Sequence, residues 1–321
     1  MIRIAVDTLG GDNGSAPMVE GILDFLKNNK DVSITAVGKK EELTKLEGIC
    51  EIVDAPDIVP MEAGPLEVMR LKNSSMYKTV MLAKEGKVDA VVSSGSTGGF
   101  LSSSTLLLKT IPGVNRAAYI APFPTKIKGH YDVVLDIGAS NENSPEELRQ
   151  FAIMGSLYSK YVLGVEEPKV FLLSNGTEAK KGSPESKEAY KLLEPYPFFK
   201  GNIEARNALD GSADVIVTDG FTGNIFLKSS EGMAKMMAGF FKDAFKKNLW
   251  TMLGYLHVRK GVKNISEIMD YKSTGGAMLL GVNGVIVKVH GNADAYSTMC
   301  AIRVAKKLAE SDLATKIKEG I

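Results

Sequence analysis

The sequence predicts an α/β protein in which a mostly parallel sheet is covered by helices on both faces, an α/β/α sandwich. Two observations carry this prediction. Short apolar runs rich in β-branched residues alternate along the chain with longer stretches of helical spacing. The short runs are apolar on both faces, which is typical of strands buried inside a parallel sheet.

Seven apolar runs predict strands: Ile2 to Val6, Ser33 to Val37, Ala90 to Val92, Val133 to Ile137, Val170 to Leu173, Val215 to Thr218 and Val285 to Val289. Five stretches predict helices: Met18 to Leu26, Leu101 to Leu108, Pro145 to Tyr161, Glu185 to Leu193 and Ala293 to Leu308. No repeat or low-complexity tract divides the chain, so residues 1–321 are expected to form a single unit. A weak subdomain boundary is predicted near residues 166–168.

Composition excludes several classes of function. The 39 basic and 38 acidic residues leave a net charge of +1, which gives no reason to expect nucleic acid as a partner. Cys50 and Cys300 are far apart, which disfavours a disulfide framework or a metal site. The sequence shows no signal-peptide pattern and no apolar run of about 18 residues. The protein is therefore expected to be cytoplasmic and not to span a membrane.

The loops that leave the strands are the places where chemistry is expected, because ligands bind outside the carboxyl ends of parallel strands. After the first strand, Gly10 and Gly11 allow a tight turn, which is either a ligand loop or only a turn. A stronger signal precedes an apolar helix, where hydroxyls and glycines form either an anion site or a capped helix start. These residues are Ser94, Gly95, Ser96, Thr97 and Gly98.

Three later loops add polar candidates. Lys181 follows the strand that ends at Leu173. His290 closes the last predicted strand and is a candidate acid or base, although a lone histidine is more often structural. Further candidates, each of which equally suits a helix cap or a surface position, are Asn202, Arg206, Asp219, Asn224 and Lys228.

Residues 233–263 predict a basic amphipathic helical segment. Apolar residues recur at the helical period from Met233 to Leu256. Seven bases stand against one acid there, a local charge of +6 in a chain whose total is +1. The segment fits packing on the core or across a dimer, a helix on an anionic membrane, or a dock for an acidic protein. The candidate contact residues are Phe240, Phe241, Lys246, Lys247, Trp250 and Leu253.

Taken together, these segments resemble the PlsX family of phosphate acyltransferases along essentially the whole chain. The most specific block runs from Val215 to Lys228 and contains Asp219-Gly220-Phe221-Thr222-Gly223-Asn224. Other matching blocks are residues 7–12, 69–76, 92–98, 135–139, 150–155, 200–206 and 280–282, and the pair His290-Gly291. So many blocks in the same order make a chance resemblance implausible.

The resemblance implies a phosphotransacetylase-like fold, related to isocitrate and isopropylmalate dehydrogenases. It implies a homodimer that converts acyl carrier protein (ACP) loaded with a fatty acid, together with inorganic phosphate, into acyl phosphate and free ACP. The acyl phosphate would feed acylation of glycerol 3-phosphate in phospholipid synthesis. No cofactor and no metal are implied. Peripheral association with the membrane, near the membrane-bound acyltransferase that consumes the product, is favoured, and ACP is the acidic partner.

On this basis Lys181, Asn224 and His290 are the predicted catalytic residues. Lys181 and the loop from Ser94 to Gly98 are expected to bind phosphate or the oxyanion, and His290 to manage a proton. The remaining candidates, Gly10, Gly11, Asn202, Arg206, Asp219 and Lys228, are expected to complete the substrate pocket. The chain departs from the common family pattern at Asn13, Ser96, Ser140 and Ala117.

Two other functions fit the sequence. One is a short-chain phosphotransacetylase that uses acetyl-CoA on the same fold, which acyl-chain preference would distinguish. The other is a non-catalytic organiser of lipid synthesis at the membrane surface, which would bind without turnover.

Overall fold

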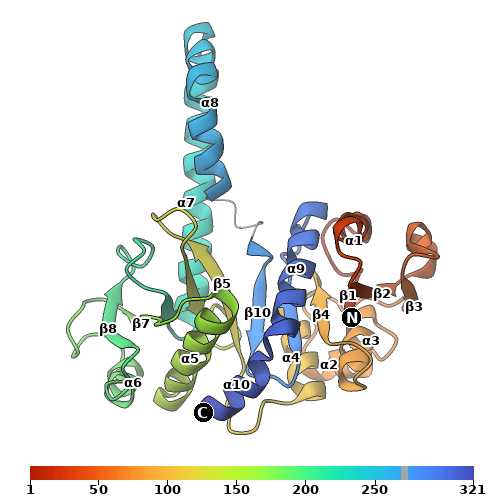
Figure 1. Ribbon diagram of the computed structural model, residues 1–321, viewed down its shortest axis with the longest axis horizontal. Helices are drawn as coiled ribbons and strands as arrows, with labels where there is room; N and C mark the ends of the chain where they lie inside the picture. The colour runs from red at the N-terminus through yellow and green to blue at the C-terminus, as the bar shows by residue number, and fades with distance from the viewer. Residues whose placement is uncertain (269–273) are drawn as a thin grey trace.

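The computed structural model describes residues 1–268 and 274–321. The described residues form one 11-stranded sheet between two layers of helices (Figure 1). In sheet order the strands are β3 (Glu51–Asp54), β2 (Val32–Gly38), β1 (Ile2–Asp7), β4 (Ala90–Ser93), β11 (Val285–Lys288), β10 (Ala277–Leu280), β5 (Ala118–Pro124), β6 (Tyr131–Leu135), β9 (Val215–Val217), β7 (Val170–Ser174) and β8 (Phe199–Glu204).

Each face of the sheet is covered by its own set of helices. One face carries α1 (Ala16–Asn28), α5 (Pro145–Tyr158), α6 (Pro184–Leu193), α9 (Ala295–Ser311) and α10 (Leu313–Gly320). The other carries α2 (Pro65–Arg70), α3 (Ser75–Lys84), α4 (Thr97–Leu108) and the start of α7 (Gly220–Lys246). Along β1, Ile4 and Val6 belong to the first apolar core and Ala5 to the second. This alternation confirms a sheet buried on both faces.

The predicted strands and helices are all present, with shifted ends. The predicted strand Val133 to Ile137 stops at Leu135 because residues 138–140 turn back around the Asp136 carboxylate. Four strands were not predicted. β5 contains two prolines, β8 contains a glycine, and β3 and β10 are only four residues long. Residues 166–168 precede β7, within the half of the sheet that β6 to β9 form.

The missed strands β5 and β10 reverse the direction of half the sheet. β10 is antiparallel to both β11 and β5, and β5 is antiparallel to β6. Strands β1 to β4 and β11 therefore run one way, whereas β6 to β9 run the other way. The carboxyl ends of the two halves lie at opposite edges. Strand direction alone therefore does not bring all strand-ending loops to one edge of the sheet.

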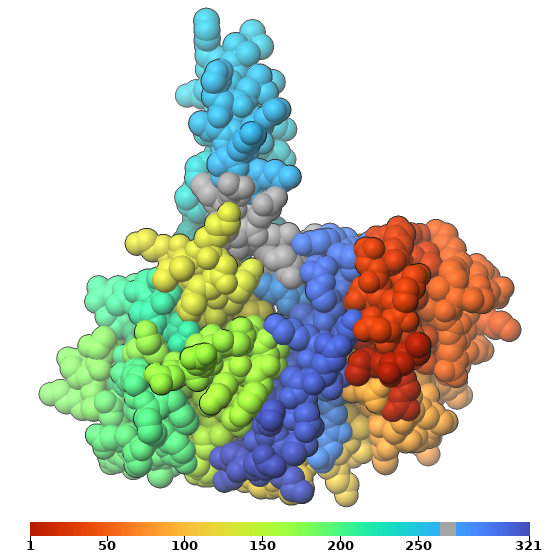
Figure 2. All heavy atoms as spheres, in the orientation of Figure 1, coloured from red at the N-terminus to blue at the C-terminus, as the bar shows by residue number. Residues whose placement is uncertain are grey.

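A helical hairpin stands away from the body of the protein (Figures 1 and 2). It consists of α7 and α8 (Leu249–Ile268), which contact each other, for example through the rings of Phe245 and Tyr255 at 5.2 Å. The sequence predicted one helical segment here, but the chain breaks at Lys247 and Asn248. The side chain of Asn248 accepts a hydrogen bond from the Thr251 N–H at 3.0 Å, which caps the second helix. Among the described helices, none has the length and apolar character to cross a membrane.

Candidate active site

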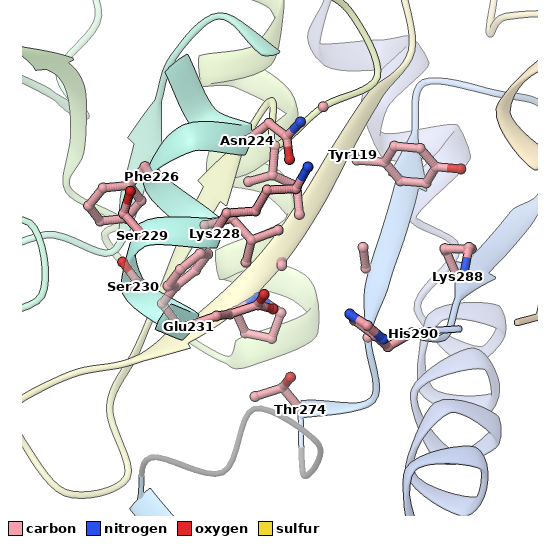
Figure 3. A pocket seen from close by; sticks show the side chains of 18 of the residues that line it. Tyr119, Asn224, Phe226, Lys228, Ser229, Ser230, Glu231, Thr274, Lys288 and His290 are labelled. Atoms are coloured by element: carbon pink, nitrogen blue, oxygen red, sulfur yellow. The ribbon is translucent and has the colours of Figure 1, made fainter. Parts of the chain in front are cut away.

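A cavity of about 1090 Å³ lies between α7 and the sheet at β5, β10 and β11 (Figure 3). Its polar part includes Asp12, Gly95, Thr97, Gly98, Tyr119, Gly138, Asn224, Lys228, Lys288, His290 and Gly291. Its apolar part follows β5 and α7 and includes Met61, Ala121, Pro122, Phe123, Pro124, Leu209, Phe226, Leu227, Met233 and Ala234. The cavity therefore combines a place for polar chemistry with a long apolar surface.

The amino end of α4 forms part of the polar wall. Thr97 and Gly98 are exposed to the cavity at the first positions of this helix, where N–H groups lack partners inside the helix. Ser96 is the helix cap: its hydroxyl accepts from the Gly99 N–H at 3.2 Å and donates to the Met61 carbonyl at 3.1 Å. Ser96 therefore shapes the wall and does not line the cavity.

The two glycines after β1 support this wall from behind. Gly10 has a φ of +84°, and a Cβ there would lie 3.0 Å from the Gly95 Cα. A Cβ on Gly11 would meet the Ser94 hydroxyl at 2.7 Å. Because Gly10, Gly11 and Ser94 are absent from the cavity lining, their role in one chain is close packing beneath the α4 loop.

The end of β11 brings a histidine to the opposite wall (Figure 3). His290 is exposed to the cavity, and its Nδ1 accepts a hydrogen bond from the Asn292 N–H at 3.3 Å. When the imidazole is neutral, its proton is therefore on Nε2. The next residue, Gly291, accepts from the Asp12 N–H at 2.7 Å, which ties this loop to the one after β1.

Lys288 also lines the cavity, although it was not among the predicted site residues. It is only 7% exposed, and its Nζ donates to the carbonyls of Ser94, at 3.3 Å, and Val289. Burial lowers the pKa of Lys288 to about 8, although the negative charges of Asp7 and Asp12 act to raise it. The feature of the sequence that could have pointed to Lys288 is a lysine between two apolar valines, in a strand with no other charged residue.

A buried carboxylate lies beneath this wall. Asp7 is 1% exposed and accepts a hydrogen bond from the Ser93 hydroxyl at 2.6 Å. Burial raises the pKa of Asp7 to about 6, although hydrogen bonds from Ser75 and Ser93 favour its charged form. Asp7 therefore contributes a negative potential close to the cavity without lining it.

The first turn of α7 carries Asn224 into the cavity from the other side (Figure 3). The helix starts with Asp219, whose carboxylate accepts from the Thr222 N–H at 2.8 Å, so Asp219 is a cap and not a cavity residue. A Cβ on Gly220 or Gly223 would overlap the Ser140 or Asp136 carbonyl oxygen, respectively. These glycines let the helix approach the turn that follows β6.

That turn is built around a buried carboxylate. Asp136 accepts hydrogen bonds from the N–H groups of Tyr119, Gly138, Ala139 and Ser140 at 2.9 to 3.1 Å. Gly138, with a φ of +131°, faces Asn224 closely, since a Cβ there would be 3.4 Å from the Asn224 Cγ. Within the described part of the chain, the Asn224 carboxamide has no hydrogen-bond partner. It is therefore available to a ligand.

Two predicted cations reach the cavity in different ways. Lys228 lies one turn beyond Asn224 on α7 and, in Figure 3, extends into the cavity. Arg206 stands at the rim, where it pairs with Glu204 at 2.7 Å and keeps 77% of its side chain exposed. Lys228 is therefore placed to contact a substrate bound in the cavity. Arg206 is placed to contact a substrate as it enters the cavity.

Lys181 and Asn202 are not brought to the cavity. Asn202 lies within β8, and Lys181 follows β7. Other residues that follow strands of the same reversed half, namely Gly138, Arg206 and Asn224, do line the cavity. Asn202 is 6% exposed, and its amide donates to the Glu178 carbonyl at 2.8 Å, which anchors the loop that carries Lys181. Within one chain, the geometry thus separates the predicted catalytic Lys181 from Asn224 and His290.

The four departures from the family pattern all have structural roles. Asn13 donates to the Ala293 carbonyl at 3.2 Å. Ser96 caps α4, and the Ser140 hydroxyl lies 2.8 Å from oxygens of Asp136 and Asn143. Ala117 is buried against the glycine-containing turn at Gly281. None of the four lines the cavity.

Comparison with known proteins agrees with the resemblance in the sequence. A family described as "Fatty acid synthesis protein" matches residues 2–316. A phosphate acyltransferase of Wolinella succinogenes is 43% identical over 326 residues, which cover 100% of this chain and 97% of that protein. The chain belongs to the PlsX family. Members of the PlsX family from Aliarcobacter butzleri and Exiguobacterium are named phosphate acyltransferase as well, each 40% identical over at least 99% of this chain and 98% of their own. The protein is therefore an acyltransferase.

Solved structures confirm the predicted phosphotransacetylase-like fold of this PlsX-family chain. A phosphotransacetylase from Streptococcus pyogenes superposes with a TM-score of 0.61 at 18% identity, covering 96% of this chain and 94% of that one. A branched-chain phosphotransacylase from Enterococcus faecalis gives 0.62 at 12% identity, with 97% and 100% covered. A dehydrogenase has a similar fold as well: 4-hydroxythreonine-4-phosphate dehydrogenase from Klebsiella pneumoniae gives a TM-score of 0.54 at 13% identity, with 96% and 100% covered.

Proposed function

We propose that the protein transfers a fatty acyl group from ACP to inorganic phosphate, and that the acyl phosphate feeds glycerol 3-phosphate acylation. The cavity carries this proposal. Its volume of about 1090 Å³ is just above the usual range for sites that hold drug-sized molecules, and far more than an acetyl group fills. The apolar surface along β5 and α7 suits a fatty chain, and the polar part suits a thioester and phosphate.

The reaction needs positioning more than a strong base. A phosphate oxygen attacks the thioester carbonyl carbon, the new C–O bond forms, and the C–S bond breaks. The sulfur leaves as the thiolate of the ACP prosthetic group and then takes up a proton. Because phosphate is already anionic at neutral pH, holding it beside the carbonyl and stabilising the tetrahedral oxyanion supply most of the rate.

The residues of the polar part divide this work. The Asn224 carboxamide is the proposed donor to the oxyanion, because it faces the cavity and has no partner among the described residues. Lys228, one turn further along α7, adds positive charge beside it. His290 faces them from β11 and carries its neutral-state proton on Nε2, so it can donate a hydrogen bond to the departing thiolate. The proton that the thiolate takes up would come from the imidazolium form of His290 or from water.

The acyl chain is proposed to lie along the apolar surface towards the base of the hairpin. Phe226 of α7 packs against Phe123 of β5 with ring centroids 5.5 Å apart, which closes one side of this surface. Further along α7, Met233 and Ala234 still line the cavity, whereas Ala238, one turn later, is exposed outside it. The side chain at residue 234 is therefore placed to limit chain length.

Replacing Ala234 by phenylalanine is expected to shift the preference towards shorter acyl chains. The added ring would fill part of the apolar surface, so kcat/KM for a 16-carbon donor should fall about tenfold or more, with little change for an 8-carbon donor. Ala238→Phe, in the same helix, is the matched control. Equal loss for both chain lengths would contradict this placement of the chain.

The hairpin supports two further parts of the proposal, a homodimer and a membrane contact. Apolar side chains are exposed along its stem, including Met233, Met236, Phe240 and Phe241, so a second copy of the chain is proposed to cover them. At the tip of the hairpin, the first residues of α8 are exposed, Leu249 by 77% and Trp250 by 82%, next to Lys246 and Lys247. This tip suits an anionic membrane surface, near the acyltransferase that consumes acyl phosphate.

The test of the central proposal is acyl phosphate formation from palmitoyl-ACP and phosphate, with the product trapped by hydroxylamine. A phosphate-dependent product with palmitoyl-ACP and a far lower rate with acetyl-CoA would support it. A preference for acetyl-CoA would identify a short-chain phosphotransacetylase. No product from either donor, with retained vesicle binding, would favour the organiser.

A further inference from the structure

Lys288 presents a charge that the described protein does not neutralise by direct contact. Its ammonium contacts two backbone carbonyls, those of Ser94 and Val289, and no carboxylate of the described residues lies within ion-pair distance. Buried charges in proteins are normally paired or coordinated, because an unpaired ion loses its hydration at a high cost in free energy. A bound anion would neutralise the charge of this buried lysine.

Of the nearest acids, Asp7 is engaged in hydrogen bonds, whereas Asp12 lines the same cavity. Asp7 accepts from the Ser93 hydroxyl at 2.6 Å and from the Leu9 N–H at 3.1 Å. Asp12 lies against Gly291, and its charge acts on Lys288 only over a distance. These carboxylates favour the charged form of Lys288 but leave its cavity side to a ligand.

The position of Lys288 shows where that anion would lie. Lys288 and His290 are two residues apart on β11 and its end, so they reach the same face of the sheet, while Val287 and Val289 belong to the core on the other face. Thr97 and Gly98 at the start of α4 line the same polar part of the cavity. Their N–H groups add to the positive potential there.

We propose that Lys288, together with the amino end of α4, forms the subsite that holds inorganic phosphate for attack on the acyl carbonyl. The subsite rests on the proposed function for its role in the reaction. It assigns the phosphate to the β11 side of the cavity and leaves the oxyanion to Asn224 on the α7 side (Figure 3). Lys181, which does not line the cavity, has no part in it.

The test is phosphate binding by the full-length protein without an acyl donor, followed as thermal stabilisation in a titration with inorganic phosphate. Lys288→Met keeps an unbranched side chain that is one atom shorter but removes its charge, so the phosphate concentration for half-maximal stabilisation should rise about tenfold or more. The matched control is Lys306→Met, because Lys306 is also largely buried but pairs with Asp31 at 2.6 Å. The control should respond to phosphate as the natural protein does.

Kinetics separate a binding role from a structural one. In Lys288→Met the KM for phosphate should rise about tenfold or more, while the KM for the acyl donor stays within about twofold; a general distortion of the cavity would change both. If the methionine variant does not fold, Lys288→Gln is titrated in the same way. An unchanged phosphate response in the folded variant would overturn the proposal.

Acyl phosphate formation tests the proposed reaction, and phosphate binding by Lys288→Met tests the subsite, so either proposal can be wrong without the other. If the natural protein forms no acyl phosphate but loses its phosphate response on replacement of Lys288, the proposed reaction is wrong and the anion subsite stands. If it forms acyl phosphate and Lys288→Met binds phosphate normally, the reaction stands and the subsite is wrong.

Discussion

Replacing Asn224 by alanine is expected to lower kcat for acyl phosphate formation about 100-fold or more. Loss of one preorganised donor to a developing oxyanion typically has an effect of this size in a site shielded from water. The KM values for phosphate and acyl donor should change much less, because the donor acts mainly on the transition state. The measurement is steady-state kinetics with palmitoyl-ACP, accompanied by thermal unfolding of the variant.

The matched control for this prediction is Asn207→Ala. Asn207 is an exposed asparagine in the turn after β8 and does not line the cavity. Its variant should retain nearly the natural kcat. If Asn224→Ala kept kcat within about fivefold while remaining folded, Asn224 would not be the oxyanion donor, and Lys228 would be the next residue to replace.

The position of Asn224 depends on glycines whose need the sequence could not reveal. Gly220 and Gly223 allow α7 to approach the carbonyls of Ser140 and Asp136, and Gly138 then leaves room for the carboxamide. The block Val215 to Lys228 was predicted to carry ligands, and Asn224 and Lys228 do line the cavity. Its other candidate, Asp219, is a helix cap, a reading that the sequence also allowed.

The strands that reverse half of the sheet could not be predicted from the sequence. Apolar periodicity predicted the alternating strands and helices, because those strands are buried on both faces. β5, with Pro122 and Pro124, and the short β10 gave no such signal, and they are the strands that reverse the sheet. The reversal by itself does not separate Lys181 from His290, because Gly138, Arg206 and Asn224 follow strands of the same half and line the cavity.

Lys288 was missed for a different reason. Its strand was recognised from the valines around it, and a lysine at a strand end is ordinarily read as solvated surface. Only the packed structure shows that the side chain is buried, that its Nζ reaches two carbonyls, and that it faces the cavity. The burial of Lys288 depends on how the loops after β1, β4 and β11 pack together, and the local sequence pattern does not show this packing.

A double replacement of Trp250 and Leu253 by glutamate is expected to abolish most binding to anionic vesicles. In the natural protein, 82% of Trp250 and 52% of Leu253 are exposed at the tip. Burying such side chains in a membrane interface contributes on the order of 2 kcal/mol each, and each nearby lysine about 1 kcal/mol. The bound fraction in vesicle sedimentation at low salt should correspond to at least a tenfold weaker affinity.

The control is a double replacement by glutamate of Tyr161 and Leu192, which are exposed far from the tip, and this variant should bind vesicles like the natural protein.

Raising the salt concentration should weaken binding of the natural protein only in part, because Lys246 and Lys247 are screened whereas the apolar contact is not. If the tip variant sedimented normally but lost affinity for ACP, the tip would be the ACP dock. The distinction follows from chemistry: a membrane accepts Trp250 and Leu253 into an apolar layer, whereas an acidic protein is attracted chiefly by the lysines.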